Sequence, residues 1–578
     1  MKDSTSVKIA YFSMEIALDP SIPTYSGGLG VLAGDTLRSA ADLSIPMAAV
    51  TLLHRKGYFR QRLDEHGNQF EEDSVWNPER VLKPLEARTS VEIEDRRVSI
   101  RAWQFSVKGI SGHEVPVYLL DTDLPENTPW DRTLTDHLYG GDDHYRLCQE
   151  AVLGIGGVEI LHALGYTSID SYHMNEGHSA LLALGLLERR LGTRRLGTAS
   201  EQDIEAVRSH CIFTTHTPVP AGHDQFPRAL MRQVLGERAQ ALEVTQCCPE
   251  GALNMTYLAL RFSRYINGVA MHHGGISQDM YPQYPVRAIT NGVHAVTWTS
   301  QPFRQLFDRH IPEWRHDNLY LRYARKIPIH EIREAHAIAK RALIDAVKIG
   351  TGVALNETAF TIGFARRATA YKRPDLPLTD PDRLRRMASR LGPVQIVYGG
   401  KAHPRDERGK ALIRRIYETA SQLKGSITIA YVEDYDIRWA QLLCSGVDLW
   451  LNTPQRPQEA SGTSGMKAAL NGVPSLSVLD GWWIEGHVEG ATGWAIGHDS
   501  NAPSDPSVEA ASLYDQLELV IFPMFYGRPL AFAEVMRLAI AVNGSFFNTQ
   551  RMLFQYVSNA YFPEQQVPTG KAAAPGRD

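Results

Sequence analysis

The segment at residues 459–472, EASGTSGMKAALNG, places a carboxylate, hydroxyls and glycines directly before a predicted helix. Such groups suit the hydroxyls of a sugar, and a Gly-Thr-Ser-Gly turn ahead of a helix also suits a phosphate. Lys467 lies in the first turn of that helix, where the helix dipole and neighbouring arginines would favour its neutral amine. A neutral amine can form a Schiff base, but a solvated helix lysine fits the same pattern. The candidate ligand groups are Glu459, Ser461, Gly462 and Thr463.

A cluster of basic residues follows a predicted strand in GFARRATAYKRPDL, residues 363–376. Open α/β sheets bind ligands at the carboxyl ends of their strands, so this position favours phosphate binding over a solvated basic turn. The basic residues are Arg366, Arg367, Lys372 and Arg373. A second turn, VYGGKAHPRDERGK at residues 397–410, offers Lys401 and Arg405 with less specificity, and there a structural role is favoured.

A glycine-rich turn lies at residues 25–43, YSGGLGVLAGDTLRSAADL, between a predicted strand and a predicted helix. Backbone N–H groups without Cβ crowding can approach an anion at a helix N-terminus. The spacing is not the dinucleotide-binding GxGxxG, and tight packing explains the same glycines equally well.

The histidine-containing segments HMNEGH (173–178) and MHHGG (271–275) lack the i, i+4 spacing of a helical metal site. We therefore expect no metal. His216 in FTTHTPVP and Asn291 in TNGVH each end a predicted strand. Neutral polar groups at several strand ends suit a polyhydroxylated ligand.

These candidate groups require parallel strands that alternate with helices, because that arrangement brings loops to one edge of a sheet. The predicted strands of the first half are 7–15, 46–54, 115–121, 168–175, 211–216, 267–273 and 286–292. A helix is predicted at 179–192, and a long helix at 328–352 leads into a second unit. The predicted strands of this second unit are 358–365, 394–400, 426–432, 447–452 and 474–480.

The predicted fold class is α/β, with two doubly wound domains facing a central cleft. We expect a first domain at 1–335, a second at 336–530, helices at 531–562 that cross back to the first domain, and a disordered tail at 563–578. The tail is rich in Pro, Gly and Ala, which is typical of disorder.

The composition is that of an ordinary globular protein of 578 residues, 43 % hydrophobic and 22 % charged. A net charge of -5 argues against a general nucleic-acid or membrane-surface binder. Five cysteines without a CxxC pair favour a reduced compartment. No signal peptide and no apolar run of about 20 residues is evident, so we expect a cytoplasmic protein.

Taken in order, the motifs GGLG, THT, TNG, ARRATAYKR and EASGTSGMK resemble the α-glucan (glycogen/maltodextrin) phosphorylase family. The resemblance runs from about residue 9 to about residue 560, and points to the compact bacterial branch without N-terminal regulatory segments. It implies two Rossmann-like domains around a cleft, the arrangement called GT-B. It also implies pyridoxal 5′-phosphate, bound as a Schiff base to Lys467, with the cofactor's phosphate rather than its aldehyde taking part in the reaction.

The resemblance also implies a role for each candidate residue. It implies that Gly27, Gly28 and Leu29 lie against the phosphates, and that Arg367 and Lys372 bind the substrate phosphate between them. Around the cofactor it implies Gly28, Arg366, Thr463, Ser464, Gly465 and Lys467. Around glucose it implies Glu459, Ser461 and Gly462 at ring hydroxyls, Asn291 and His216 at the 6-hydroxyl, and Tyr371 along the wall. The implied catalytic residues are Lys467, Arg367, Lys372 and His216, the last through a carbonyl that stabilises a positive anomeric centre.

The implied reaction is reversible phosphorolysis: a terminal α-1,4-linked glucose passes to inorganic phosphate and leaves as α-D-glucose 1-phosphate with retention. The implied partners are thus an α-1,4-glucan and phosphate or glucose 1-phosphate, and a homo-oligomer is compatible with the sequence. Two departures bear on this expectation. Ser464 and Gly465 replace the Gly-Asn of the family's SGTGNMK motif, and HMNEGHSALL replaces NDTHPAL on the acceptor side.

Three other functions are compatible with parts of the pattern. A nucleotide-sugar glycosyltransferase of the same GT-B architecture, such as a glucan synthase, shares the glycine turn and phosphate clamp but does not need Lys467. A non-catalytic glucan-binding homologue would keep the fold without turnover. A pyridoxal enzyme of amino-acid metabolism would leave the sugar-suited groups unexplained.

Overall fold

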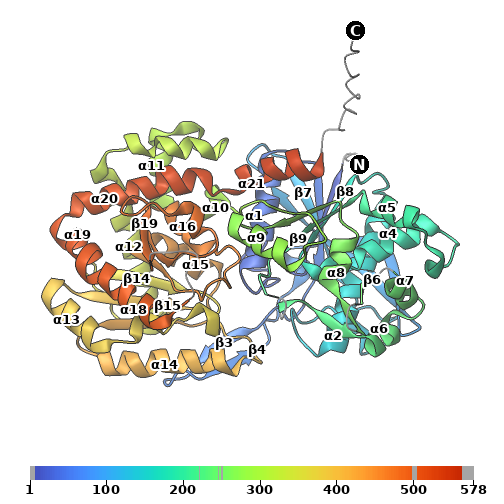
Figure 1. Ribbon diagram of the computed structural model, residues 1–578, viewed down its shortest axis with the longest axis horizontal. Helices are drawn as coiled ribbons and strands as arrows, with labels where there is room; N and C mark the ends of the chain where they lie inside the picture. Colours follow the sequence, from blue (N-terminus) through green and yellow to red (C-terminus); the bar gives the residue numbers. More distant parts are fainter. Residues whose placement is uncertain (1–6, 220–221, 245–246, 249–250, 498–503, 563–578) are drawn as a thin grey trace, which may run out of the picture.

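The computed structural model describes residues 7–219, 222–244, 247–248, 251–497 and 504–562. Two large sheets organise this part of the chain, one of nine strands and one of six. Helices cover both sheets, and the two sheets lie in separate lobes, blue to green and yellow to red in Figure 1. The predicted α/β class with parallel sheets is therefore confirmed.

The first sheet has the strand order β13-β12-β9-β8-β1-β2-β7-β6-β5. Its strands are β1 Ile9–Phe12, β2 Met47–Leu52, β5 Lys83–Ile93, β6 Arg96–Lys108, β7 Glu114–Asp121, β8 Ser171–Asn175, β9 Cys211–Thr214, β12 Tyr265–Gly268 and β13 Val286–Ala288. All neighbours pair in parallel except β5 with β6 and β6 with β7, which are antiparallel. The central strands β1, β2 and β9 are buried at every position, as expected for parallel strands covered on both faces.

The second sheet is entirely parallel, in the order β16-β15-β14-β17-β18-β19. Its strands are β14 Phe360–Ala365, β15 Val394–Gly399, β16 Thr428–Val432, β17 Leu449–Asn452, β18 Ser475–Val478 and β19 Gly493–Ile496. Two short antiparallel pairs lie outside the large sheets: β3 Arg60–Leu63 with β4 Gln69–Glu72, and β10 Gln225–Pro227 with β11 Ala252–Asn254.

Helices connect most of the parallel strands. Up to β13 they are α1 Gly28–Asp42, α2 Asp143–Ala151, α3 Gly157–Ala163, α4 Leu182–Leu191, α5 Glu201–Arg208, α6 Arg228–Leu235, α7 Arg238–Val244, α8 Met255–Arg261 and α9 Met271–Met280. After β13 they are α10 Ala295–Trp298, α11 Gln301–His310, α12 Ile329–Thr351, α13 Pro381–Leu391, α14 Glu407–Leu423, α15 Ile437–Gly446, α16 Ser464–Ala469, α17 Trp483–Gly486, α18 Pro506–Asp515, α19 Phe522–Gly527, α20 Pro529–Leu538 and α21 Thr549–Tyr556.

Apolar side chains form a separate core on each face of each sheet. Phe12 and Val50 point to one face of the first sheet, while Tyr11 and Ala49 belong to the core on the other face. This alternation follows from the period of two along a strand. The second sheet divides in the same way, and its larger core also takes in apolar residues from Val293 to Ile327.

The C-terminal helix α21 returns to the first sheet, as the red helix beside the blue lobe in Figure 1 shows. Met552 and Tyr556 are buried in the core that covers one face of that sheet. The Ser39 hydroxyl in α1 lies 2.6 Å from that of Thr549, and the Tyr561 hydroxyl lies 2.7 Å from Nδ1 of His173 in β8. The return is therefore fixed by polar as well as apolar contacts.

One predicted strand is misplaced, two strands were not predicted, and the predicted tail lies outside the described residues. The strand expected at 267–273 is Tyr265–Gly268, and its second half forms the start of helix α9 at Met271. The antiparallel strands β5 and β6 were missed, because their exposed and half-buried positions carry charged residues instead of an apolar run. The tail at 563–578 lies outside the described residues.

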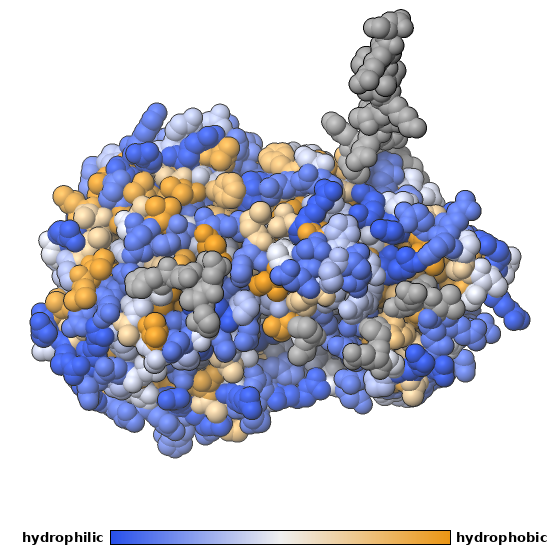
Figure 2. All heavy atoms as spheres, viewed as in Figure 1, coloured by the Kyte–Doolittle hydropathy of each residue, from blue (hydrophilic) through white to orange (hydrophobic). Residues whose placement is uncertain are grey.

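The surface carries mostly hydrophilic residues, with apolar side chains scattered among them on the face in Figure 2. Within the described ranges, no single helix is both long and apolar enough to cross a bilayer. The helical segments Pro506–Gly527 and Pro529–Gly544 meet that length and composition only as a pair, and the pair is bent by 105°.

Candidate active site

A cavity of about 960 Å³ lies between the carboxyl-end loops of the two large sheets. The first sheet contributes the glycine turn at α1 and the loop after β9, and the second contributes the loops after β14, β15 and β17. Every residue predicted for the site lines this cavity except Gly465. The predicted lining residues are Gly27, Gly28, Leu29, His216, Asn291, Arg366, Arg367, Tyr371, Lys372, Glu459, Ser461, Gly462, Thr463, Ser464 and Lys467.

Lys467 is a buried lysine without a charged partner. Its Nζ lies 3.9 Å from the centre of the Trp298 ring, and among the described residues this amine has no hydrogen bond or ion pair. Burial lowers the pKa of Lys467, although Asp35 and Cys444 act in the opposite direction. The sequence analysis predicted a lowered pKa for a different reason. Helix α16 has only six residues, with Lys467 in its last turn, so burial rather than the helix dipole is the main cause.

Two of the predicted cations share one carboxylate. The Arg366 guanidinium lies 2.7 Å and the Lys372 amine 2.5 Å from the same Glu459 oxygen, Oε2. The charges of Arg366 and Lys372 keep the pKa of Glu459 below its usual value despite burial. Glu459 is therefore ionised and engaged by cations, and its second oxygen is the one left for a ligand. Arg373, predicted as part of the same cluster, points away and donates to the Thr453 carbonyl at 2.8 Å.

Arg367 differs from these cations because no carboxylate among the described residues forms an ion pair with it, although Glu15 is near enough to raise its pKa. It is exposed to the cavity, and within the described part of the chain it forms no ion pair or hydrogen bond. Its Nη2 lies 3.4 Å from the place where a Cβ on Gly27 would be. A guanidinium without an ion pair beside a glycine turn has the geometry and charge to bind an anion with several oxygens.

The glycine turn is held by Glu15, which follows β1. Glu15 Oε2 accepts hydrogen bonds from the backbone N–H of Ser26 at 2.5 Å and of Gly27 at 3.2 Å. The N–H of Gly27, expected to face a phosphate, is thus already used. Gly28 remains open, with no atom within 4 Å of an added Cβ, whereas a Cβ on Gly30 would meet Glu15 Oε2 at 2.7 Å. The turn therefore combines the two alternatives: Gly30 serves packing and Gly28 faces open space.

Neutral polar groups line the side of the cavity formed by the first sheet. His216 Nε2 lies 2.7 Å from Asn175 Oδ1, and the His216 backbone N–H donates to Glu176 Oε2 at 2.8 Å. Burial lowers the pKa of His216 to about 3, so the ring is neutral at pH 7. Asn291 Oδ1 and Ser461 Oγ are buried, and neither has a hydrogen-bond partner among the described residues. Such orphaned atoms are expected where a polar ligand supplies the missing bonds.

Known proteins match this chain over nearly its whole length. A family model described as carbohydrate phosphorylase covers residues 236–493. A maltodextrin phosphorylase from Thermococcus litoralis is 41 % identical over 96 % of this chain and 70 % of its own length. Glycogen phosphorylases from Mycobacterium tuberculosis and Aquifex aeolicus are 36 % and 34 % identical, over 96 % and 97 % of this chain and 71 % and 87 % of their own lengths. The chain belongs to the carbohydrate phosphorylase family.

At the two positions where this phosphorylase departs from the family motif, Ser464 lines the cavity and Gly465 does not. The Ser464 hydroxyl accepts a hydrogen bond from Trp450 Nε1 at 3.0 Å and lies 3.5 Å from Asn452 Oδ1. Gly465 does not line the cavity, and a Cβ there would meet Trp482 at 2.8 Å. The Ser464 hydroxyl is therefore held by Trp450 and Asn452, and the lack of a side chain at Gly465 leaves room for Trp482.

Several acidic residues of this phosphorylase site were missed in the sequence analysis. Glu15, Glu176 and Asp480 each follow within three residues of the end of a parallel strand. Asp480 Oδ2 accepts the backbone N–H of Glu459 at 2.9 Å, and burial raises the pKa of Asp480 to about 7. Glu176 has a φ of 74°, a strained conformation of the kind that clusters at functional sites. The rule that ligands bind beyond the carboxyl ends of strands could have found all three.

No group of three or more metal-ligating His, Cys, Asp or Glu side chains occurs within the described residues.

Proposed function

We propose that this member of the carbohydrate phosphorylase family is an α-glucan phosphorylase. It would transfer the terminal α-1,4-linked glucose of glycogen or maltodextrin to inorganic phosphate, giving α-D-glucose 1-phosphate with retention, in a reversible reaction. The printed names of the relatives support this substrate class. The observation that carries the proposal is the pair of basic side chains in the cavity that have no ion pair among the described residues, Arg367 and Lys467.

The residues present fit pyridoxal 5′-phosphate, the cofactor that the family implies. Lys467 offers an unpaired amine whose neutral form is favoured by burial, which a covalent bond to an aldehyde requires. Arg366 Nη1 is buried without a hydrogen-bond partner among the described residues, and Thr463 lines the cavity. These residues, with Gly28, would hold the cofactor. When bound, it would supply a phosphate group beside the substrate phosphate for proton transfer or charge stabilisation.

Different side chains around the cavity would bind the phosphate and the glucose. Arg367 would bind the substrate phosphate, with Lys372 joining when its contact to Glu459 loosens. Asn291 and His216 would take the 6-hydroxyl of glucose, and the His216 carbonyl would face the positive anomeric centre. The groups for the remaining contacts would be Glu459, Ser461 and Gly462 at ring hydroxyls, with Tyr371, Gly27 and Leu29 along the phosphate path.

Phosphate itself would protonate the departing 4-hydroxyl, so the reaction requires no pair of catalytic carboxylates. The carboxylates near the site instead have structural partners, which is consistent with a reaction that does not use them as acid and base. Glu15 holds the glycine turn, Glu176 holds the backbone of His216, and Glu459 balances two cations.

We also propose that the two lobes are Rossmann-like domains in the GT-B arrangement. Two parallel sheets whose strand ends share one cavity support it. The expected division was 1–335, 336–530 and crossing helices at 531–562. Because apolar residues from Val293 to Ile327 pack in the second core, we place the boundary near residue 292 instead.

The proposal is tested by cofactor trapping together with turnover. We expect the purified protein, supplied with pyridoxal 5′-phosphate, to show a visible absorbance band that borohydride reduces to an adduct on Lys467. Lys467→Ala would lose the adduct, while Lys401→Met would keep it, because Lys401 lines the cavity but is paired with Asp434 at 2.6 Å. The loaded protein would release glucose 1-phosphate from maltodextrin and phosphate. Failure to take up the cofactor, together with glucosyl transfer from a nucleotide sugar, would overturn the proposal.

A further inference from the structure

A hydrogen-bonded relay crosses the carboxyl ends of three adjacent strands, β1, β8 and β9. It begins at the Glu15 carbonyl, which accepts the Ser13 hydroxyl at 2.8 Å. Ser13 Oγ accepts from Asn175 Nδ2 at 3.1 Å, and Asn175 Oδ1 faces His216 Nε2 at 2.7 Å. Ser13 and Asn175 are almost completely buried, so water does not compete for these bonds.

The direction of every bond in the relay follows from its first member. A carbonyl can only accept, so the single proton of Ser13 points to Glu15 and its oxygen must accept from the next group. The side of the Asn175 amide facing Ser13 is therefore the NH2, and the side facing His216 is the oxygen. The reversed network would leave the buried Glu15 carbonyl without this donor, at a cost of about 1–3 kcal/mol.

We infer that Asn175 is a positioning residue that fixes His216 in the Nε2–H tautomer and so makes Nδ1 a hydrogen-bond acceptor toward the cavity. The oxygen of Asn175 needs a proton from Nε2. A neutral imidazole carries one N–H, so Nδ1 is left with its lone pair. Burial, which lowers the pKa of His216 to about 3, keeps the ring neutral. Among the described residues, Nδ1 has no hydrogen-bond partner of its own.

The consequence is a rule for substrate recognition, which rests on the proposed function. A hydroxyl that binds to Nδ1 must donate its proton there. A glucose with its 6-hydroxyl intact can do so, while a sugar bearing fluorine at that position cannot. The relay thus determines specificity through residues that never touch the sugar.

The test compares α-D-glucose 1-phosphate with its 6-deoxy-6-fluoro analogue, in glucosyl transfer to maltodextrin. The ratio of the two kcat/KM values is measured for wild type and variants, so the intrinsic effect of fluorine cancels. Asn175→Leu removes the acceptor that fixes the tautomer, and we expect the preference for the hydroxyl to fall on the order of tenfold. Asn267→Leu, which removes a buried amide at the end of β12, should lower stability and leave the ratio unchanged.

A second readout does not depend on turnover or on the folding of the Asn175 variant. Two-bond proton–nitrogen correlation spectra of histidine-labelled wild type report the tautomer, and His216→Gln identifies the signal. An Nε2–H pattern supports the inference, and an Nδ1–H pattern overturns it, even if the protein proves not to be a phosphorylase. An active enzyme whose preference for the hydroxyl is equal in wild type and Asn175→Leu also overturns it.

Discussion

Arg367 and Arg366 are adjacent in sequence but differ in what balances their charge. Arg366 contacts Glu459 at 2.7 Å and is nearly buried, whereas Arg367 is exposed to the cavity without an anionic partner. A cation held in a cavity without compensation binds an anion more strongly than one already paired. The two residues should therefore respond differently to the same substitution.

We expect Arg367→Gln to raise the KM for phosphate by ten- to a hundredfold, since a hydrogen bond to a charged group contributes about 1.5–3 kcal/mol. Its melting temperature should stay the same or rise, because no ion pair is lost. Arg366→Gln is the matched control and should lower the melting temperature, because Glu459 loses one of its two partners. Steady-state kinetics with varied phosphate and thermal unfolding measure both effects. An unchanged KM for phosphate in Arg367→Gln would exclude this residue from the anion site.

Residue types and their positions after strands predicted which residues line the cavity, but not how they pair. Arg367 was identified because open α/β sheets bind ligands at the carboxyl ends of strands, and Lys467 because its motif resembles that of the phosphorylase family. The pairing of Lys372 with Glu459 joins residues 87 positions apart, which a single sequence does not reveal. Glu15 and Gly27 are only 12 positions apart, but their hydrogen bond depends on how the loop after β1 folds against the glycine turn, which the local sequence does not reveal.

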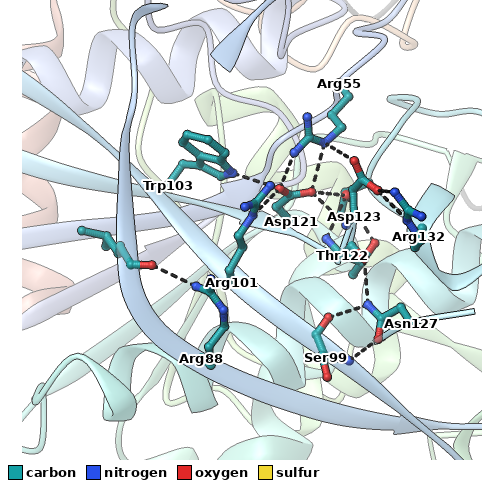
Figure 3. A network of polar contacts seen from close by, with 12 residues as sticks. Arg55, Arg88, Ser99, Arg101, Trp103, Asp121, Thr122, Asp123, Asn127 and Arg132 are labelled. Carbon is teal, nitrogen blue, oxygen red and sulfur yellow. Dashed lines mark hydrogen bonds and ion pairs between the residues drawn. The ribbon is translucent and has the colours of Figure 1, made fainter. Parts of the chain in front are cut away.

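At the scale of elements, Asp121 joins the end of β7 to β6 and to the loop after β2 (Figure 3). Its Oδ2 lies 2.6 Å from Arg55 Nη2, 2.8 Å from Arg101 Nε and 2.9 Å from Trp103 Nε1. Burial opposes ionisation, but Arg55 and Trp103 bring the pKa of Asp121 below its usual value. Ionised Asp121 therefore stabilises this edge of the first sheet.

We expect Asp121→Asn to lower the free energy of unfolding at pH 7 by about 3 kcal/mol, as when one partner of a buried ion pair is removed. Because the folded-state pKa is lowered, the wild-type advantage is present above the unfolded-state value of about 3.9 and is lost as pH falls below it. Denaturant unfolding at pH 7 and in steps below pH 4 measures this dependence. Asp123 belongs to the same network, but its side chain is 31 % exposed. Asp123→Asn should therefore lower the free energy of unfolding by less than about 1 kcal/mol. Equal losses for the two variants would contradict the argument.

Elements with buried parallel strands were predictable, since an apolar run followed by a turn and a helix marks each one. The antiparallel strands β5 and β6 mix buried, half-buried and exposed positions and carry many charges, so they show no such apolar run. The hairpin β3–β4 is even harder to predict from sequence, because its strand RQRL has no apolar face of its own. The hairpin is stabilised by contacts with the other lobe, and such contacts cannot be predicted from a local sequence pattern.

At the scale of the whole molecule, this hairpin connects the two lobes beside the cavity; in Figure 1 it is the blue pair of strands next to α14. Gln61 in β3 donates to the Gly400 carbonyl at 3.1 Å and accepts the Asp434 N–H at 3.1 Å. Gln69 in β4 makes two bonds with the backbone of Ala402, both at 2.9 Å. Gly400 also lines the cavity, so the hairpin holds part of the second lobe's wall.

We expect Gln61→Leu to loosen this connection while leaving each lobe folded. The substitution keeps the size of the side chain but removes the partner of the Asp434 N–H, a loss of about 1–3 kcal/mol. The Gly400 carbonyl loses its bond to Gln61 and keeps only the bond from the Tyr431 hydroxyl within its own lobe. Hydrogen exchange should therefore rise at residues 400–402 and 433–435 and remain unchanged at the buried strands β1 and β14. Because Gly400 would lose its bond to the first lobe, kcat/KM for phosphorolysis should fall on the order of tenfold. Arg62→Ala, which removes a 42 % exposed side chain from the same strand, is the control and should change exchange little. If exchange at 400–402 were the same in Gln61→Leu and wild type, the lobes would be held together by their other contacts, and the fall in kcat/KM should then be absent as well.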